Sequence, residues 1–131
     1  MSDKFTVEII IPNKTILKAE TNEVTIPSYE GQMGILKDHI PLITFLRPGI
    51  ISLQDQEKKY YVEEGTVEFS NNNLLILTST ARNLADFNHS SIEDLISIAE
   101  SQLSDNNSSD KEKYKLSYKI STLKEINQKT I

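Results

Sequence analysis

The chain has 131 residues, a formal net charge of −5 and no cysteine. Without cysteine it has no disulfide framework, no thiolate zinc site and no cysteine nucleophile. Its acidic balance argues against nucleic acid as a partner, because phosphates need a basic surface. The longest purely apolar run is the four residues Leu74–Leu77, far short of the roughly 20 that span a bilayer. The opening residues lack the charged and then apolar pattern of a secretory leader, so we expect neither secretion by a signal nor membrane insertion.

Residues 5–80 have the pattern of short strands separated by turns. Phe5, Val7 and Ile9 recur at every second position, which is the period of a half-buried strand. We expect a short strand that stops at Pro27, and a type II turn at Pro48-Gly49 with the glycine at positive φ. Further strand-like runs are Ile51–Leu53, Lys59–Val62, Thr66–Phe69 and Leu74–Thr78, with a polar turn at Asp55–Lys58 and a hairpin turn at Ser70–Asn73. The repeated units predict a small β-sandwich or barrel.

After residue 88 the apolar residues follow a helical period. Ile92, Leu95, Ile96, Ala99 and Leu103 form one stripe, and the capping pair is either Ser90 with Glu93 or Ser91 with Asp94. A second helix, capped by Ser109 or Asp110, carries the stripe Leu116, Ile120, Leu123 and Ile126. We therefore predict a mostly β plus α fold, in which a β-sandwich domain (1–88) is followed by an antiparallel two-helix hairpin (89–131). The narrow stripes predict a hairpin of marginal stability.

Few residues are candidates for catalysis. His39 lies beside Asp38, and this pair could perform acid–base chemistry or could simply be a loop histidine with satisfied hydrogen bonds. Glu63 and Glu64 are sequence neighbours that point to opposite faces of a strand, so they form a poor catalytic pair. No set of nucleophile, base and orienting residue accompanies them, and no metal-ligand spacing occurs. We expect a non-enzymatic protein without a cofactor or metal.

Two segments are candidates for partner binding. Met33, Ile35 and Leu36 lie in or just after the glycine-bounded stretch Gly31–Gly34, where they either present an apolar loop surface or fill the core. The last helix carries a set of lysines, which form either a solvated face or a basic surface for an acidic partner. These lysines are Lys111, Lys113, Lys115, Lys119, Lys124 and Lys129.

The segment from residue 26 to 50 has a specific pattern. Ile26-Pro27-Ser28-Tyr29-Glu30-Gly31-Gln32-Met33-Gly34-Ile35-Leu36, His39-Ile40-Pro41-Leu42-Ile43-Thr44 and Leu46-Arg47-Pro48-Gly49-Ile50 follow one another. This pattern resembles the signature of the epsilon subunit of F-type ATP synthases, whose mitochondrial counterpart is the delta subunit. The resemblance extends over essentially the whole chain.

The resemblance implies a central-stalk rotor subunit that links the gamma subunit to the ring of c subunits. It assigns the c-ring contact to Glu30, Gly31, Gln32, Met33, Gly34, Ile35 and Leu36, in a loop at the foot of the rotor. It assigns the gamma contact to His39, Pro41 and Leu42. The C-terminal helices would extend to the alpha/beta catalytic head and inhibit ATP hydrolysis through the lysines above. The implied location is peripheral, on the cytoplasmic face of the bacterial inner membrane or its organelle equivalent.

Two departures from the family pattern limit these expectations. Lys37-Asp38 stands where family members often have Pro-Gly before the histidine, which changes the local loop. In the stretch Ile92–Ser97, Ile96 stands where nucleotide-binding members have an arginine for phosphate, so we expect no ATP binding. The alternative to a rotor subunit is a free-standing β-sandwich binding module with a helical tail.

Overall fold

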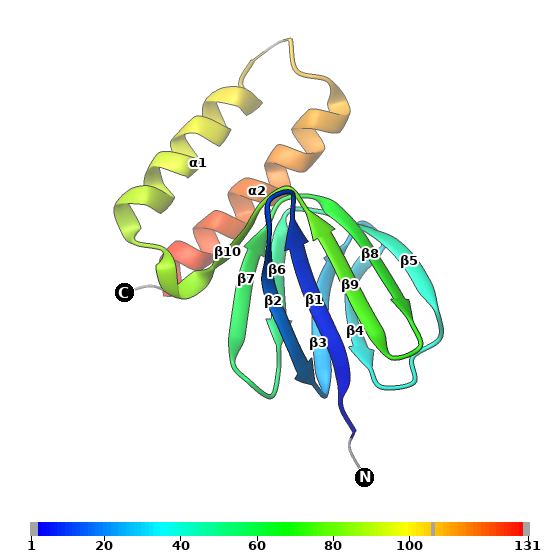
Figure 1. Cartoon of the computed structure of the whole chain (residues 1–131). Coiled ribbons are helices and arrows are strands. Elements are labelled where there is room, and N and C mark those ends of the chain that lie inside the picture. The colour runs from blue at the N-terminus through cyan, green and yellow to red at the C-terminus, as the bar shows by residue number, and fades with distance from the viewer. Residues whose placement is uncertain (1–2, 106, 130–131) are drawn as a thin grey trace. The chain divides into compact units, whose positions relative to one another are not determined.

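The computed structural model describes residues 3–105 and 107–129, with Lys129 described for its backbone only. The chain divides into two compact units, Met1–Asn83 and Leu84–Ile131, which we call the β unit and the helical unit. The β unit contains ten strands, and the helical unit contains a short 3-10 helix and two α-helices. Figure 1 labels these elements along the chain. The predicted class, a β-sandwich followed by a two-helix hairpin, is confirmed.

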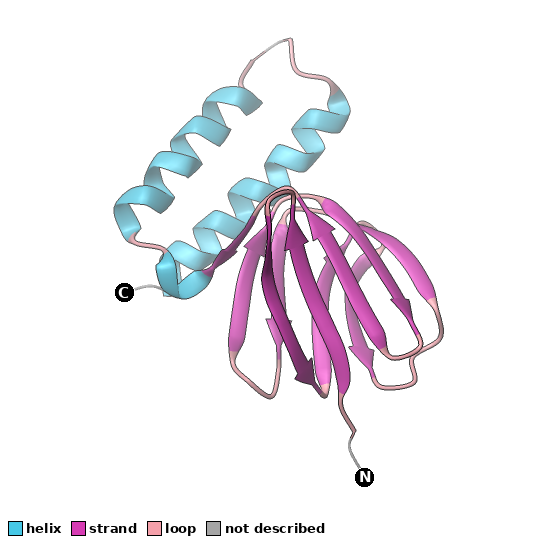
Figure 2. Ribbon diagram, in the orientation of Figure 1, coloured by secondary structure: helices cyan, strands magenta, loops and turns pink. Residues whose placement is uncertain are grey.

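The β unit is one sheet that folds over itself into two five-stranded layers (Figure 2). The first layer contains, in spatial order, β2 (Lys14–Thr21), β1 (Phe5–Ile11), β9 (Asn73–Thr78), β8 (Gly65–Ser70) and β5 (Leu42–Leu46). The second layer contains β4 (Gly31–Leu36), β3 (Glu23–Ser28), β6 (Gly49–Leu53), β7 (Lys58–Val62) and β10 (Ala81–Asn83). All strand pairs are antiparallel except β1 with β9, which run parallel.

The layers join where β3 pairs with β5 through the single pair Ser28 and Leu46. At this joint the Ser28 and Thr44 hydroxyls, both buried, lie 2.8 Å apart. The Pro27 carbonyl accepts a hydrogen bond from the Arg47 amide at 3.0 Å. Strands β5 and β6 therefore meet at a corner, where the chain passes from one layer to the other as strands do in orthogonal sheet packing.

Two sequence expectations fail at this corner. Pro27 does not end its strand but lies within β3, at the break between the pairing of β3 with β6 and with β5. An interrupted ladder tolerates a residue without an N–H. Gly49 is not the positive-φ residue of a type II turn, since Gly31 is the only glycine at positive φ among the described residues. Gly49 instead starts β6, and a Cβ there would lie 2.5 Å from the Pro27 Cβ.

The core lies between the two layers and is formed by alternate residues of nearly every strand. Its members with an exposed fraction of 0% are Val7, Ile9, Val24, Ile26, Ile35, Ile51, Val62, Val67 and Ile76. Phe5 and Phe69 meet edge to face, with ring centroids 5.5 Å apart. The predicted hairpin turn at Ser70–Asn73 is confirmed, and Asn71 and Asn72 both adopt positive φ, as a type I′ turn requires.

The helical unit begins with the 3-10 helix η1 (Leu84–Asp86), followed by α1 (His89–Leu103) and α2 (Asp110–Lys129). Both predicted N-caps of the first helix were wrong, because Asn88 Oδ1 accepts the Ser91 amide at 2.9 Å. For the second helix the Ser109 alternative is confirmed, since its hydroxyl accepts the Glu112 amide at 3.2 Å. The predicted stripes are buried at Ile92, Ile96, Ala99, Ile120, Leu123 and Ile126.

Candidate partner-binding surfaces

The expected c-ring loop is not a loop. Residues 31–36 form strand β4, which pairs with β3 along its whole length from Gly31 opposite Ser28 to Leu36 opposite Glu23. Its side chains alternate, so Ile35 is fully buried in the core and Met33 packs partly against it. Ile35 therefore has no surface for a partner in this fold. The remaining predicted residues, Glu30, Gly31, Gln32, Gly34 and Leu36, are exposed.

The same alternation sorts the residues of β5. Leu42, Thr44 and Leu46 face the core, whereas Ile43 and Phe45 point outward and are 75% and 61% exposed. The predicted contact residue Leu42 is thus only half-exposed and packs on the core. Sequence reasoning missed Ile43 and Phe45, although the pattern Leu-Ile-Thr-Phe-Leu with two inward neighbours could have indicated them.

Ile43 and Phe45 lie on an outer face of the first layer that carries further apolar side chains, with the exposed Thr66 and Glu68 of β8 between them. Thr66 lies opposite Phe45 in the β5–β8 register, and Leu77 lies opposite Thr66 in the β8–β9 register. Leu77 is 44% exposed and is paired with Ile10 of β1. We call the residues of this face the outer-sheet patch, which comprises Ile10, Ile43, Phe45, Leu75 and Leu77.

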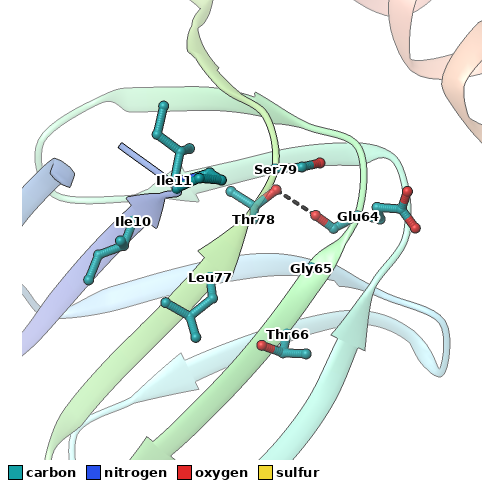
Figure 3. Close-up of a pocket in the computed structure, with 9 residues that line it drawn as sticks. Ile10, Ile11, Glu64, Gly65, Thr66, Leu77, Thr78 and Ser79 are labelled. Carbon is teal, nitrogen blue, oxygen red and sulfur yellow. Dashed lines mark hydrogen bonds between the residues drawn. The ribbon is translucent and has the colours of Figure 1, made fainter. Parts of the chain in front are cut away.

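An open hollow of about 610 Å³ continues the outer-sheet patch at one end of the layer. Figure 3 shows that Ile10, Ile11 and Leu77 provide apolar walls, whereas Glu64 and Ser79 lie at the polar side. The residues that complete the lining are Pro12, Gly65, Thr66 and Thr78. The Thr78 hydroxyl donates a hydrogen bond to the Glu64 carbonyl at 2.5 Å, which holds the turn between β7 and β8 against the end of β9.

His39 is a loop histidine whose ring Nδ1 has a backbone hydrogen-bond partner, which agrees with one of the two sequence alternatives. Its ring Nδ1 lies 2.7 Å from the Ile40 carbonyl, and the ring meets Phe69 edge to face at 5.9 Å. The Asp38 carboxylate accepts a hydrogen bond from Asn72 rather than from the His39 ring. Next to His39, Pro41 is exposed, and Ile40 is 74% exposed.

The lysines of α2 lie on two sides of its apolar stripe. Lys111, Lys115 and Lys119 recur every four residues along one side. Lys113 and Lys124 are three turns apart on the other side, and Lys124 Nζ lies 3.9 Å from Glu100 Oε2 of α1. The side chain of Lys129, the sixth predicted residue, lies outside the described residues.

Within residues 3–105 and 107–129, no group of three or more His, Cys, Asp or Glu side chains is placed to hold a metal ion. No helix of this described part has an apolar stretch long enough to cross a membrane. Ile96, which by the resemblance stands where nucleotide-binding members have an arginine, belongs to the buried stripe of α1.

Comparison with known proteins agrees with the fold. Residues 4–84 match the family model "ATP synthase, Delta/Epsilon chain, beta-sandwich domain". The chain is 45% identical to an ATP synthase epsilon chain of Pelagibacter ubique over 130 residues, which are 97% of this chain and 100% of that relative. It is 37% identical to the mitochondrial ATP synthase subunit delta of Schizosaccharomyces pombe over 114 residues, 83% of this chain and 66% of that relative.

Two solved structures have the same fold at low sequence identity. A chain of the Euglena gracilis mitochondrial ATP synthase structure containing OSCP, F1 and the c-ring superposes with a TM-score of 0.76 at 17% identity, covering 98% of this chain and 82% of that one. A chain from the Tetrahymena thermophila central stalk and c-ring structure gives 0.59 at 16% identity, covering 96% of each chain. The family model matches the β-sandwich over its length, and the Pelagibacter relative aligns with 97% of this chain. This chain therefore belongs to the delta/epsilon chain family of ATP synthases.

Proposed function

We propose that this chain is a non-catalytic central-stalk subunit of a rotary ATP synthase, and that its β unit connects the gamma subunit to the c-ring. The observation that carries the proposal is the outer-sheet patch, a group of apolar side chains on the outer face of β1, β5 and β9 with Thr66 and Glu68 of β8 between them, on a chain with a net charge of −5. Exposed apolar faces of this kind mark protein–protein interfaces. Membership of the delta/epsilon family supports the identity of the partners.

The gamma-binding surface is, in this proposal, centred on Ile43, Phe45 and Leu77 of the outer-sheet patch. Large apolar side chains at the centre of an interface contribute most of its binding energy. His39 and Pro41 continue this surface from the loop before β5. Leu42 lies on the opposite side of β5, where its side chain packs on the core and holds the strand in place.

The c-ring contact falls, in this proposal, on the exposed residues between β3 and the end of β4. Glu30, Gly31 and Gln32 form the turn, and Gly34 and Leu36 follow along the strand. Gly31 has φ +119, a conformation that favours glycine. Replacing Gly31 with a residue that has a side chain would strain the backbone of this turn.

The helical unit is proposed to be the regulatory part of the chain. Its two helices are joined by narrow stripes of buried residues, by a hydrogen bond between His89 and Asn127, and by the exposed pair Lys124–Glu100. Exposed ion pairs contribute little to stability. We propose that this hairpin opens at a cost of a few kcal/mol, so that the α2 lysines meet acidic surface on the alpha/beta head and slow ATP hydrolysis. In this role the chain is peripheral, on the cytoplasmic face of the bacterial inner membrane or its organelle equivalent.

Replacing an exposed residue of the outer-sheet patch tests the gamma contact. Ile43→Ser and Phe45→Ser should each weaken the association with gamma about tenfold or more, because they remove apolar area from the interface. Neither should lower the thermal unfolding temperature, since both side chains are exposed in the free chain. Ile98→Ser is the matched control, because Ile98 is 55% exposed on α1. Unchanged affinity of the Ile43 and Phe45 variants would refute the proposed surface.

Truncation tests the regulatory role. ATP hydrolysis by the catalytic head with gamma is titrated with the full chain and with a version ending at Asn88. We expect both to bind and only the full chain to inhibit. If both bind and neither inhibits, the helical unit is no brake, and if neither binds, the central-stalk assignment fails.

A further inference from the structure

The loop before the gamma-binding surface contains a non-glycine residue in the left-handed region. Asp38 has φ 65, and the His39 amide donates to the Leu36 carbonyl at 3.1 Å, which closes a four-residue turn with Asp38 at its third position. This position of the turn favours glycine, and aspartate and asparagine adopt it more readily than other residues. Asp38 therefore adopts a backbone conformation that would be strained for most other residues with a side chain.

Asp38 is tied to the β8–β9 hairpin by two reciprocal hydrogen bonds. Its backbone amide donates to Asn72 Oδ1 at 2.7 Å, and Asn72 Nδ2 donates to Asp38 Oδ1 at 3.0 Å. The two residues are 34 positions apart in the sequence. The side chain of Asn72 thus provides an acceptor for the Asp38 amide and a donor for the Asp38 carboxylate.

Asn72 is itself held in place by the sheet. It lies at φ 57 in the two-residue turn between the paired residues Ser70 and Asn73. Its carbonyl accepts a hydrogen bond from the amide of Thr6 in β1 at 3.1 Å. The Asn72 side chain therefore projects from a backbone that two neighbouring strands fix.

We propose that Asp38 and Asn72 form a clamp that positions the segment from His39 to Ile43 for docking of the gamma subunit. The proposal rests on the function proposed above for the outer-sheet patch. Directly after the clamp come the exposed Ile40 and Pro41, and then Ile43 of the patch. Asp38 and Asn72 are positioning residues in this account, because they act through the segment that follows them.

The physical basis of the clamp is pre-organisation. A loop that must be ordered on binding reduces the apparent affinity by the fraction of time it spends in other conformations. The two hydrogen bonds join exposed residues, so each competes with water and adds little to global stability. Their effect should appear in the binding of gamma rather than in the unfolding temperature.

Asn72→Gly is the decisive variant. It removes both hydrogen bonds, yet it places the dipeptide Asn-Gly in the β8–β9 turn, the pair that type I′ hairpins prefer. We expect an unchanged or higher unfolding temperature together with an affinity for gamma that falls about threefold to tenfold. Asn71→Gly is the matched control, since Asn71 occupies the same turn at φ 52 but takes part in neither of the two hydrogen bonds with Asp38.

Variants at Asp38 provide the conservative test. Asp38→Asn keeps an acceptor oxygen for Asn72 Nδ2 and tolerates positive φ, so it should bind gamma like the unsubstituted chain. Asp38→Gly tolerates the backbone but loses the acceptor, so its affinity should lie between those of the unsubstituted chain and Asn72→Gly. The double variant Asp38→Gly/Asn72→Gly should be no weaker than Asn72→Gly alone, because the two residues act as one unit.

Amide hydrogen exchange of the free chain gives a readout that is independent of gamma. The Asp38 amide should exchange more slowly in the unsubstituted chain and in Asn71→Gly than in Asn72→Gly. Equal exchange, or equal affinity of Asn72→Gly and Asn71→Gly for gamma, would overturn the clamp while leaving the gamma contact intact. If the unsubstituted chain does not bind gamma, the docking proposal fails and the positioning role fails with it.

Discussion

Gly65 of the β unit occupies a position where a neighbouring strand leaves no room for a side chain. A Cβ on Gly65 would lie 2.2 Å from the Leu77 carbonyl oxygen and 2.9 Å from the Thr78 Cα. Both are backbone atoms of β9, so relief requires movement of the strand rather than rotation of a side chain. The same strand carries Leu77 of the outer-sheet patch, so a shift of β9 would also displace this residue of the proposed binding face.

Gly65→Ala should therefore destabilise the chain by about 2 kcal/mol or more, because strand β9 must shift to accept the methyl group. Gly34→Ala is the control, since the Cβ there would meet only the Glu23 carboxylate, at 3.4 Å. It should change stability by less than about 0.5 kcal/mol. Chemical denaturation of the two variants provides the measurement, and equal stabilities would contradict the packing argument.

Asp55, in the turn between β6 and β7, links local electrostatics to acid stability. A hydrogen bond from the Thr21 hydroxyl is the largest of the causes that hold the pKa of the Asp55 carboxyl below its ordinary value, and Lys4 adds a weaker attraction at 3.9 Å. A carboxyl whose pKa is lower in the folded chain contributes stability above its ordinary pKa of 3.8. That contribution is lost as the pH falls through the lowered value.

Asp55→Asn should accordingly lower the unfolding temperature at neutral pH, and the difference from the unsubstituted chain should shrink as the pH falls below 3.8. Thr21→Val should raise the pKa of Asp55 toward its ordinary value, because it removes the principal donor. Thermal unfolding measured across this pH range tests both variants. A difference between Asp55→Asn and the unsubstituted chain that stays constant with pH would rule out the linkage.

At the scale of single elements, the boundaries depend on hydrogen-bond partners more than on apolar periodicity. The stripe of α1 is correctly expected from spacing, but its start is decided by Asn88, which supplies an acceptor to the Ser91 amide. Ser90 and Ser91, the expected caps, lie inside the helix. Strand β4 shows the same effect. Its two glycines and short apolar run indicate a loop when the sequence is considered alone, but the hydrogen bonds with β3 make the segment a strand.

Asn88→Ala should destabilise the helical unit by about 1 kcal/mol, because the Ser91 amide loses its acceptor. Asn88→Asp keeps an acceptor oxygen and adds a negative charge at the helix N-terminus, so it should restore or exceed the original stability. Loss of helical circular dichroism on heating reports the change. An alanine variant as stable as the unsubstituted chain would show that the first turn is held by other contacts.

At the scale of the whole molecule, the two units differ in how much core each one contains. The core cluster of the β unit draws only on residues between Phe5 and Ala81. The helical unit buries few large side chains, and its helices of 15 and 20 residues carry narrow stripes. We therefore expect the β unit to fold independently and the helical unit to open at a lower cost in free energy.

A chain ending at Asn88 should unfold cooperatively with a β-sheet circular dichroism spectrum, because its core is complete. A peptide of residues 84–131 should show less helix than the same residues contribute to the full chain, because isolated helices of this length are marginal in water. The comparison of the three spectra measures this difference. A fully helical isolated peptide would contradict the low cost of opening on which the proposed brake depends.

The sequence by itself determined the class of the fold, the helical period after residue 88 and the family, because each depends on local spacing or on a contiguous signature from Ile26 to Ile50. It determined less about the surfaces. Ile35, Leu42 and Phe45 all belong to that signature, yet only the pairing of their strands decides which side chain is buried and which is exposed.

Tertiary structure alone decided the roles of Pro27, Gly49 and Asp38. Pro27 remains within a strand because β3 changes partners there, and Gly49 is required because the strand corner brings Pro27 within 2.5 Å of its Cβ position. Asp38 keeps its left-handed turn through Asn72, 34 residues away. Contacts between distant segments depend on register and layer, which a one-dimensional pattern does not contain.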